Sequence, residues 1–254
     1  MNSAVFHFFG NLNDFLPPDR RNVDYLYSFE ENPSVKHLFE SLGVPHIEVD
    51  QIRVNGIRVD YSYQVQNSDR VEVFPLSSDR AINENGLLTK IEGEPRFILD
   101  NHLGRLAAYL RMLGLDTLYK NDYQDEELAL VANRERRVLL TRDRRLLMRN
   151  AIIYGYYVRS QFPKDQLVEV VQRYQLVVWI KPFQRCLHCN TPLENVNKEK
   201  VLPRLEPLTK QYFNEFHICP NCQKIYWKGS HYERMLKLVQ QTRHENGSGS
   251  DFEC

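Results

Sequence analysis

The chain has 254 residues, of which 42% are apolar, 11% aromatic and 26% charged; this composition is globular and excludes a disordered or a fibrous chain. The length exceeds that of one average domain, so we expect one large domain or two to three small ones. The 33 basic residues equal the 33 acidic ones in number, and this zero net charge, taken over the whole chain, argues against a nucleic-acid-binding protein.

The sequence carries no signal for a membrane. No apolar run approaches the roughly 18 residues that a membrane span needs, and the longest candidate runs only from Leu176 to Ile180. The N-terminus shows no basic leader followed by an apolar segment and a cleavage site. We therefore expect a cytoplasmic protein with no membrane partner.

Residues 1–80 are acidic, with 7 basic and 12 acidic side chains, and their pattern is that of an α+β domain. Apolar residues at helical spacing end at Gly43, which predicts a helix, and Asn55-Gly56 between two apolar runs predicts a hairpin. The expected elements are strands over 4–9, 51–54, 57–59 and 71–75 and a helix over 35–42.

This N-terminal segment resembles the ubiquitin-like β-grasp modules that are related to bacterial sulfur carriers. Sulfur carriers react through a C-terminal Gly-Gly, whereas the last expected strand here continues through Phe74-Pro75-Leu76-Ser77. The resemblance therefore implies a docking or regulatory role towards a protein partner. The alternative is a packing module that has no partner of its own.

After a polar stretch over 81–95 that predicts a linker, residues 96–185 are basic, with 16 basic and 10 acidic side chains. The neutral average therefore conceals an acidic N-terminal module and a basic middle, which is typical of a polyanion-binding domain or of a plain solvated surface. Strands are expected over 96–99, 117–119, 137–141 and 156–158, and helices over 103–113, 125–132 and 167–174. This alternation predicts a parallel sheet in an α/β domain.

Three aspartates are the candidate catalytic residues of this domain. Asp100 and Asp143 follow expected strands, and Asp125 begins a helix, so all three are expected at the carboxyl edge of the sheet. Close carboxylates repel each other unless a divalent cation neutralises them, and oxygen ligands suit Mg²⁺ or Mn²⁺. The alternative is that each aspartate is a helix N-cap; both roles are compatible because a cap leaves one carboxylate oxygen unused.

Four cysteines predict a zinc site. Cys186-x-x-Cys189 and Cys219-x-x-Cys222 are separated by 29 residues and supply the four thiolates of a closed structural Zn²⁺ centre. Such a centre has no open position for water, so its expected role is stability. Between the two pairs, a helix is expected through Leu202 to Tyr212, where two prolines restrict its start.

Basic and aromatic residues suggest contacts with a nucleic acid. Guanidinium groups beside a carboxylate site suit phosphate oxygens, and an aromatic-basic stretch follows the second cysteine pair. The candidate RNA-binding residues are Arg105, Arg142, Arg144, Arg145, Lys228 and His231. The alternative for each is a solvated surface position. For Trp227 in the same stretch we favour packing of the zinc-binding segment against the sheet.

The motifs of the middle and C-terminal parts together resemble one family. The run from Phe97 to Gly114, then Asp125-Glu-Glu-Leu, Leu139-Leu-Thr-Arg-Asp143 and the stretch from Cys186 to Met235, is similar to the PIN-like ribonucleases named for the C-terminal domain of the Mut-seven exoribonuclease. The resemblance covers about residues 96–238, and the N-terminal segment resembles the extension found in bacterial members.

This resemblance implies a metal-dependent RNase whose acids are Asp100, Asp125 and Asp143. PIN nucleases commonly carry a fourth acid after the next strand, but this chain has Val158-Arg159-Ser160 there and no carboxylate before Asp165. The candidates to substitute for it are Asn101, Asp122 and Glu126.

The sequence therefore predicts a PIN-like α/β domain at 96–185 with a zinc ribbon at 186–241. A ubiquitin-like α+β domain at 1–80 and a linker at 81–95 precede them, and a disordered tail at 242–254 follows. The main hypothesis is an Mg²⁺- or Mn²⁺-dependent ribonuclease whose zinc ribbon helps to bind RNA. The alternatives are a non-catalytic RNA-binding protein of the same fold and a protein-interaction adaptor that acts through the β-grasp domain.

Overall fold

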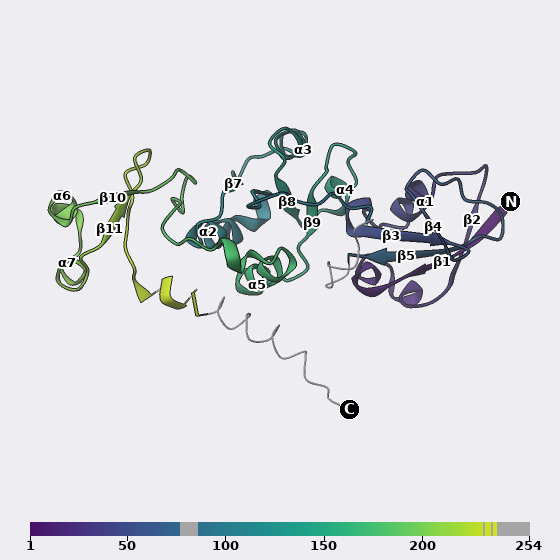
Figure 1. The fold of residues 1–254 in the computed structure, drawn as a ribbon, viewed down its shortest axis with the longest axis horizontal. Helices are drawn as coiled ribbons and strands as arrows, with labels where there is room; N and C mark the ends of the chain where they lie inside the picture. Colours follow the sequence, from purple (N-terminus) through teal and green to yellow (C-terminus); the bar gives the residue numbers. More distant parts are fainter. Residues whose placement is uncertain (77–85, 231, 235, 238–254) are drawn as a thin grey trace, which may run out of the picture. The chain divides into compact units, whose positions relative to one another are not determined.

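The computed structural model describes residues 1–76, 86–230, 232–234 and 236–237 (Figure 1). They divide into two compact units: a first unit of Met1–Ile91 and Asp125–Tyr157, and a second unit of Glu92–Gln124 and the described residues from Val158 onward. Residues 81–85 of the expected linker and the expected tail lie outside the described residues. None of the helices among the described residues is both long and apolar enough to cross a bilayer.

The N-terminal part of the first unit is a five-stranded sheet (Figure 1). Its strands are β1 (Asn2–Phe8), β2 (Tyr25–Phe29), β3 (Val49–Val54), β4 (Ile57–Val59) and β5 (Arg70–Pro75), in the order β2-β1-β5-β3-β4. Its helices are η1 (Gly10–Phe15), η2 (Pro18–Arg20), α1 (Val35–Ser41) and η3 (His46–Glu48). The β1–β5 pair is parallel and the other pairs are antiparallel.

Local sequence explains these elements. Alternation in β1 buries Ala4, Phe6 and Phe8, which join the apolar core beneath the sheet. The β3–β4 hairpin turns at Asn55 and Gly56 with φ angles of 52° and 80°, a left-handed pair that this dipeptide adopts more readily than most. The predicted strands and helix of this part are therefore confirmed, whereas β2 is an additional strand.

The second half of the first unit comes from residues 125–157. Its helices are α3 (Asp125–Arg134) and α4 (Arg144–Leu147), and its strands are β8 (Val138–Thr141) and β9 (Gly155–Tyr157). The strands pair in parallel, and all four residues of β8 are buried. A parallel pair buried in this way is expected to be apolar throughout, as Val-Leu-Leu-Thr nearly is.

The N-terminal sheet packs on this second half through η3. The Glu48 carboxylate, 2% exposed, accepts a hydrogen bond of 2.7 Å from the backbone N–H of Tyr157. Gly155 faces Ile47 so closely that a Cβ built there would clash with the Ile47 Cδ1 atom. The two parts of the first unit are therefore held by a buried charged hydrogen bond and by direct packing.

Arg144 is the second connection between these two parts. Its Nη1 donates to the Phe15 carbonyl at 2.7 Å and its Nη2 donates to the Asp14 carbonyl at 3.4 Å. The guanidinium also lies over the Phe15 ring, 5.3 Å from its centroid, and over the Tyr157 ring at 5.8 Å. The Arg144 guanidinium is thus engaged within the first unit by two backbone carbonyls and two aromatic rings.

Replacing Arg144 with Ala is expected to destabilise the first unit by about 2 kcal/mol, because two hydrogen bonds from the guanidinium and two cation–π contacts are lost together. Urea unfolding of the full chain measures the difference. Arg145→Ala is the matched control, since Arg145 is exposed on the same short helix and its change should stay within about 0.5 kcal/mol. Equal destabilisation by both variants would contradict the role assigned to Arg144.

The second unit begins with a parallel β-strand pair and its helices. The elements are β6 (Phe97–Leu99), η5 (Asn101–Leu103), α2 (Gly104–Met112), β7 (Thr117–Tyr119), α5 (Pro163–Arg173) and η6 (Leu176–Trp179). β6 pairs with β7 in parallel, and α2 packs against α5. The parallel pairs that alternate with helices, here and in residues 125–157, confirm the predicted α/β class.

The C-terminal part of the second unit is a small antiparallel sheet of β10 (Glu194–Val196), β11 (Phe216–Ile218) and β12 (Ile225–Tyr226). We call residues 186–230 the ribbon. The helix expected from Leu202 to Tyr212 is wrong, because the segment breaks at its prolines into α6 (Lys198–Val201), η7 (Leu202–Arg204) and α7 (Pro207–Tyr212). Proline lacks the N–H that an uninterrupted helix would need at these positions.

Candidate metal centre and nucleic-acid interface

The two cysteine pairs of the ribbon lie together as the sequence predicts. Their four Sγ atoms all lie within 4.8 Å of one another, and two pairs are as close as 3.4 Å (Cys186 to Cys222) and 3.5 Å (Cys189 to Cys219). Sulfur atoms bound tetrahedrally at about 2.3 Å from one Zn²⁺ ion are about 3.8 Å apart. The donor set and its spacing therefore fit a four-thiolate zinc ion.

Both cysteine pairs are presented by the same turn. The backbone N–H of Asn190 donates to the Cys186 carbonyl, and that of Gln223 donates to the Cys219 carbonyl, each at 2.9 Å. Asn190 and Gln223 both have left-handed φ angles, 65° and 59°, at the position after the second cysteine. Two equivalent knuckles thus aim two sulfur atoms each at a common point.

The thiols of this centre ionise unequally. Burial opposes ionisation of Cys189, but hydrogen bonds from Thr191 and the neighbouring thiols lower its pKa to about 5. Burial and the adjacent thiols raise the pKa of Cys222 to about 12. Ionisation is therefore easier at Cys189 than at Cys222, and a divalent cation bound by the four sulfur atoms would favour the thiolate form of all of them.

Arg111 of α2 ties the first knuckle to the helices of the second unit. The side chain is 4% exposed; its Nη1 donates to the carbonyls of Leu187 and His188 at 3.0 and 2.9 Å, and its Nε donates to the Thr117 carbonyl at 2.8 Å. Burial lowers the pKa of Arg111, while the nearby Cys186 and Cys189 oppose this shift. The thiolate forms of Cys186 and Cys189 are therefore a countercharge for this buried guanidinium.

Asn190 makes a second tie between the ribbon and the strands. Its Nδ2 donates to Asp116 Oδ1 at 2.8 Å, and its Oδ1 accepts from the backbone N–H of Thr117 at 3.1 Å. Arg185 reaches the other oxygen of Asp116 at 3.3 Å. The ribbon is therefore joined by buried polar contacts to β7 and α2.

Replacing Arg111 with Met is expected to destabilise the second unit by about 3 kcal/mol, since it removes charged hydrogen bonds and leaves buried carbonyls without a donor. Urea unfolding and the rate of zinc release to a chelator measure the two consequences. The control is Arg105→Met, an exposed arginine on the same helix, which should change neither quantity. Unchanged zinc release in Arg111→Met would refute the proposed coupling.

Asp143 follows β8 and caps α4, as the alternative interpretation expects. Its Oδ1 accepts from the backbone N–H groups of Arg145 and Leu146 at 2.7 and 3.4 Å. Among the described residues, its second oxygen, Oδ2, has no hydrogen-bond partner. The cap thus uses one carboxylate oxygen and leaves the other available.

The other two aspartates lie in different surroundings. Asp100, 8% exposed, follows β6 in the second unit, and its Oδ1 accepts from the Asn101 N–H at 2.6 Å. Asp125 is the exposed first residue of α3 in the first unit, with its Oδ2 3.7 Å from Arg149 Nη2. Among the described residues, one group of three or more potential ligands lies within reach of a single metal ion, and it consists of the four cysteines. The three aspartates belong to no such group among these residues.

The structure also shows the surroundings of the three residues considered as substitutes for a fourth acid. Glu126 Oε1 accepts from Arg149 at 2.8 Å, and this hydrogen bond lowers the pKa of the Glu126 carboxyl. Asp122 and Asn101 are exposed. In the segment after β9, the two oxygens of Glu169 accept from the backbone N–H groups of Arg159 and Ser160, each at 2.8 Å.

The predicted RNA-binding residues differ in their surroundings. Arg105 and Arg145 are exposed on α2 and α4, and Arg142 is half-buried directly after β8. Arg144 is occupied by the contacts with Phe15 and Asp14 described above. These four arginines therefore do not share one environment.

The ribbon carries the remaining two candidates. Lys228 forms an ion pair of 2.8 Å with Glu215, and this hydrogen bond raises the pKa of Lys228. His231 lies outside the described residues. Trp227 packs against the small ribbon core beside Phe213 and Phe216. A packing role is therefore confirmed, but its partner is the core of the ribbon itself.

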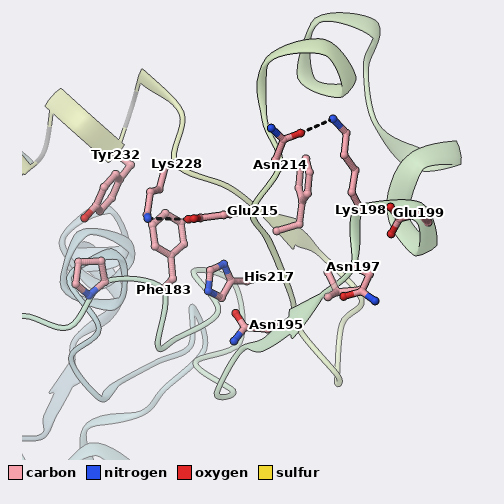
Figure 2. A pocket seen from close by; sticks show the side chains of 13 residues that line it. Phe183, Asn195, Asn197, Lys198, Glu199, Asn214, Glu215, His217, Lys228 and Tyr232 are labelled. Carbon is pink, nitrogen blue, oxygen red and sulfur yellow. Dashed lines mark hydrogen bonds and ion pairs between the residues drawn. The ribbon is translucent and has the colours of Figure 1, made fainter.

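The ribbon and the residues on either side of it also line a pocket that sequence reasoning missed. It has a volume of about 830 Å³ and is formed by residues 182–183, 195–199, 214–217, 228 and 232 (Figure 2). His217 on its wall has a buried Nδ1 atom with no hydrogen-bond partner in the described part of the chain, and burial lowers the pKa of this histidine. Its lining comes from five separate places in the sequence, so no single motif could have indicated it.

Comparisons with known proteins agree with this division of the chain. A family described as the Mut7-C RNAse domain matches residues 95–239, and one described as Mut7-C ubiquitin matches residues 1–80. Comparison with curated proteins and with solved structures gives no match. The RNase family match supports an RNA-related nuclease role, and the N-terminal match identifies the five-stranded sheet with α1 as a ubiquitin-like domain.

Proposed function

The chain belongs to the Mut7-C RNAse domain family, and from this premise we propose that it is a metal-dependent ribonuclease that hydrolyses phosphodiester bonds of RNA. The family match over residues 95–239 carries the proposal, because it spans the expected acids and the four cysteines together. The metal would be Mg²⁺ or Mn²⁺, and its ligands would be Asp100, Asp125 and Asp143.

The donor chemistry of these residues supports the proposal. All three ligands are carboxylates, which hard divalent cations prefer, and Asp143 keeps one oxygen without a partner after capping α4. When bound, the metal would lower the pKa of a water molecule and neutralise charge on the scissile phosphate. The contribution of the chain is to hold the carboxylates on short connections directly after β6 and β8.

The RNA backbone would be contacted by basic residues outside the metal site. Arg105 and Arg145 are exposed and Arg142 directly follows β8, so these three arginines are the candidates for phosphate contacts on the helices. Lys228 and His231 would add contacts from the ribbon. The four-thiolate zinc ion keeps the ribbon folded and takes no part in hydrolysis, since all four of its positions are filled by sulfur.

One observation favours a second candidate, a non-catalytic RNA-binding protein. The chain has no carboxylate at Val158-Arg159-Ser160, and both oxygens of Glu169, which reaches this segment, accept backbone hydrogen bonds there. Arg149 in addition contacts both Asp125 and Glu126. A weakened acidic site of this kind would bind RNA without cutting it.

The ubiquitin-like domain suggests an interaction with a protein partner. The apolar side chains of Leu26 on β2 and Ile57 on β4 are 63% and 71% exposed on the two edge strands of its sheet. An adaptor role through this domain is compatible with either function of the RNase domain.

The test uses the zinc-loaded full chain freed of other divalent cations. Labelled single-stranded and structured RNAs are incubated with and without Mn²⁺, beside the Asp100→Asn variant. The ribonuclease proposal requires cleavage that depends on Mn²⁺ and is lost in the variant. Tight RNA binding without cleavage would favour the second candidate, and cleavage that persists in Asp100→Asn without Mn²⁺ would refute the metal site.

A further inference from the structure

The ribbon pocket has an aromatic side that suits a planar ligand. The Phe183 and His217 rings are stacked, with their centroids 5.0 Å apart and their planes 16° from parallel. The Tyr232 ring packs against the Phe183 ring at a tilt, with the two centroids 4.8 Å apart. All three rings are half-buried, so part of each surface remains accessible. Figure 2 shows them on one side of the pocket, with Asn197 and Lys198 on the other.

Phe183 is held in a conformation that phenylalanine rarely adopts. Its φ angle is 60°, in the left-handed region where the Cβ atom crowds the backbone. In this conformation the Phe183 ring contacts the His217 and Tyr232 rings and lines the pocket. A non-glycine residue kept in a disfavoured conformation beside a cavity is a recognised mark of a functional position.

The polar side of the pocket carries amides that are not used by the fold. Asn197 occupies the N-cap position of α6, where asparagine normally bonds a backbone N–H of the first turn, yet its side chain makes no cap hydrogen bond. Asn195 also lines the pocket, and neither side chain has a hydrogen-bond partner among the described residues. Each exposed amide therefore offers two donor hydrogens and one acceptor oxygen to a ligand.

The charges that line the pocket balance, so they give no net attraction for a phosphate as its main ligand. Lys228 is paired with Glu215, and Lys198 donates to Asn214 Oδ1, both at 2.8 Å. With Glu199 as the second acid, the two lysines and two glutamates balance. A neutral pocket with an aromatic side and free amides fits an uncharged heteroaromatic ring that carries hydrogen-bonding edges.

We propose that this pocket binds one unpaired nucleobase of RNA, which stacks on the Phe183 side and is read along its edge by Asn195 and Asn197. The inference rests on the proposed function, since it takes RNA to be the ligand. Stacking on an aromatic ring is tolerant of sequence, whereas amide contacts with a base edge distinguish bases. The ribbon would thereby give the nuclease a base preference beside its site of cleavage or binding.

The test measures the affinity of the zinc-loaded full chain for short labelled oligo(A), oligo(C) and oligo(U), by fluorescence anisotropy without added Mg²⁺ or Mn²⁺. We expect the preferred oligonucleotide to bind about tenfold more tightly than the poorest. The double variant Asn195→Ala, Asn197→Ala should reduce this ratio to less than about twofold, because the edge contacts are removed while the stacking side stays.

Two further variants test the stacking side of the pocket and control for an amide outside it. Phe183→Leu should weaken binding of all three oligonucleotides by about tenfold, since it removes the ring against which His217 and Tyr232 pack and so disrupts the stacking side of the pocket. Gln211→Ala, an exposed amide on α7 outside the pocket, should leave both affinity and preference unchanged. Circular dichroism and zinc content confirm that each variant is folded.

The possible failures are distinguishable. Wild-type chain that binds RNA with equal affinity for all three bases, or a double variant that keeps the preference, overturns the base pocket and leaves the RNA-related function standing. Absence of binding to any RNA overturns the pocket together with the proposed function.

Discussion

Replacing Cys219 with Ser is expected to abolish zinc binding and to unfold the ribbon. Cys219 is fully buried, and its Sγ belongs to the set of four sulfur atoms within 4.8 Å of one another. Binding of structural zinc to such a set is worth about 10–16 kcal/mol in zinc-finger peptides. The ribbon core of Val201, Leu205 and Phe216 contributes only about 1.5–3 kcal/mol per side chain, so it cannot replace the metal.

Zinc stoichiometry by elemental analysis and limited proteolysis measure the two effects. Wild-type chain should hold one zinc ion and resist cleavage within residues 186–230, whereas Cys219→Ser should hold none and be cut there. The control is Cys254→Ser, which changes the fifth cysteine, outside both Cys-x-x-Cys pairs, and should behave as wild type. A Cys219→Ser protein that retains the ion would show that zinc is held elsewhere.

Loss of zinc is also expected to affect the helices of the second unit. Arg111 is buried beside the thiolates and donates to the carbonyls of Leu187 and His188. Without the folded knuckle, these acceptors move away and a buried guanidinium is left with fewer partners. Cys219→Ser should therefore lower the urea midpoint of the second unit as a whole.

The second large effect concerns Asp143, whose two roles are separable by substitution. Asparagine caps helices as well as aspartate does, so Asp143→Asn should keep the bonds to Arg145 and Leu146 and the stability of α4. The substitution removes the negative charge that the proposed metal requires. We expect RNA cleavage to fall by about 100-fold or more, while the unfolding midpoint changes little.

Asp143→Ala provides the comparison, because it removes the cap as well as the charge. It should lose cleavage to the same extent and in addition about 1 kcal/mol of stability. Mn²⁺-dependent cleavage rates and urea unfolding of both variants are measured beside Asp19→Asn, an exposed aspartate in η2 that should alter neither. Full cleavage by Asp143→Asn would leave Asp143 with a capping role alone.

Much of the fold could be predicted because its signals are local. Asn55-Gly56 specifies the β3–β4 hairpin through its own φ preferences, and the two Cys-x-x-Cys pairs identify the zinc site by spacing. The apolar runs over 97–99 and 138–141 likewise predicted buried strands. β2 was not predicted, since its residues are half-exposed and are ordered only by pairing with β1.

The parts that could not be predicted depend on partners distant in the chain. Arg144 was interpreted from its neighbours around Asp143, yet it donates to carbonyls about 130 residues earlier. Arg111 was unremarkable in the sequence because the carbonyls that it binds come from the zinc knuckle. The amides Asn195 and Asn197 could not be assigned to a binding pocket from the sequence, because the rings that line the same pocket come from residues 183, 217 and 232.

The packing of Ile47 over Gly155 also affects the folding of the chain during synthesis and the choice of truncation points. Residues 1–80 are a separate domain by family match, but Ile47 and Glu48 pack on residues that are synthesised more than a hundred positions later. On the ribosome, the ubiquitin-like domain would emerge long before β9, with its η3 surface still uncovered. A truncation at residue 80 or 95 would expose both sides of this contact, so point substitutions across it are the sounder way to separate the two domains.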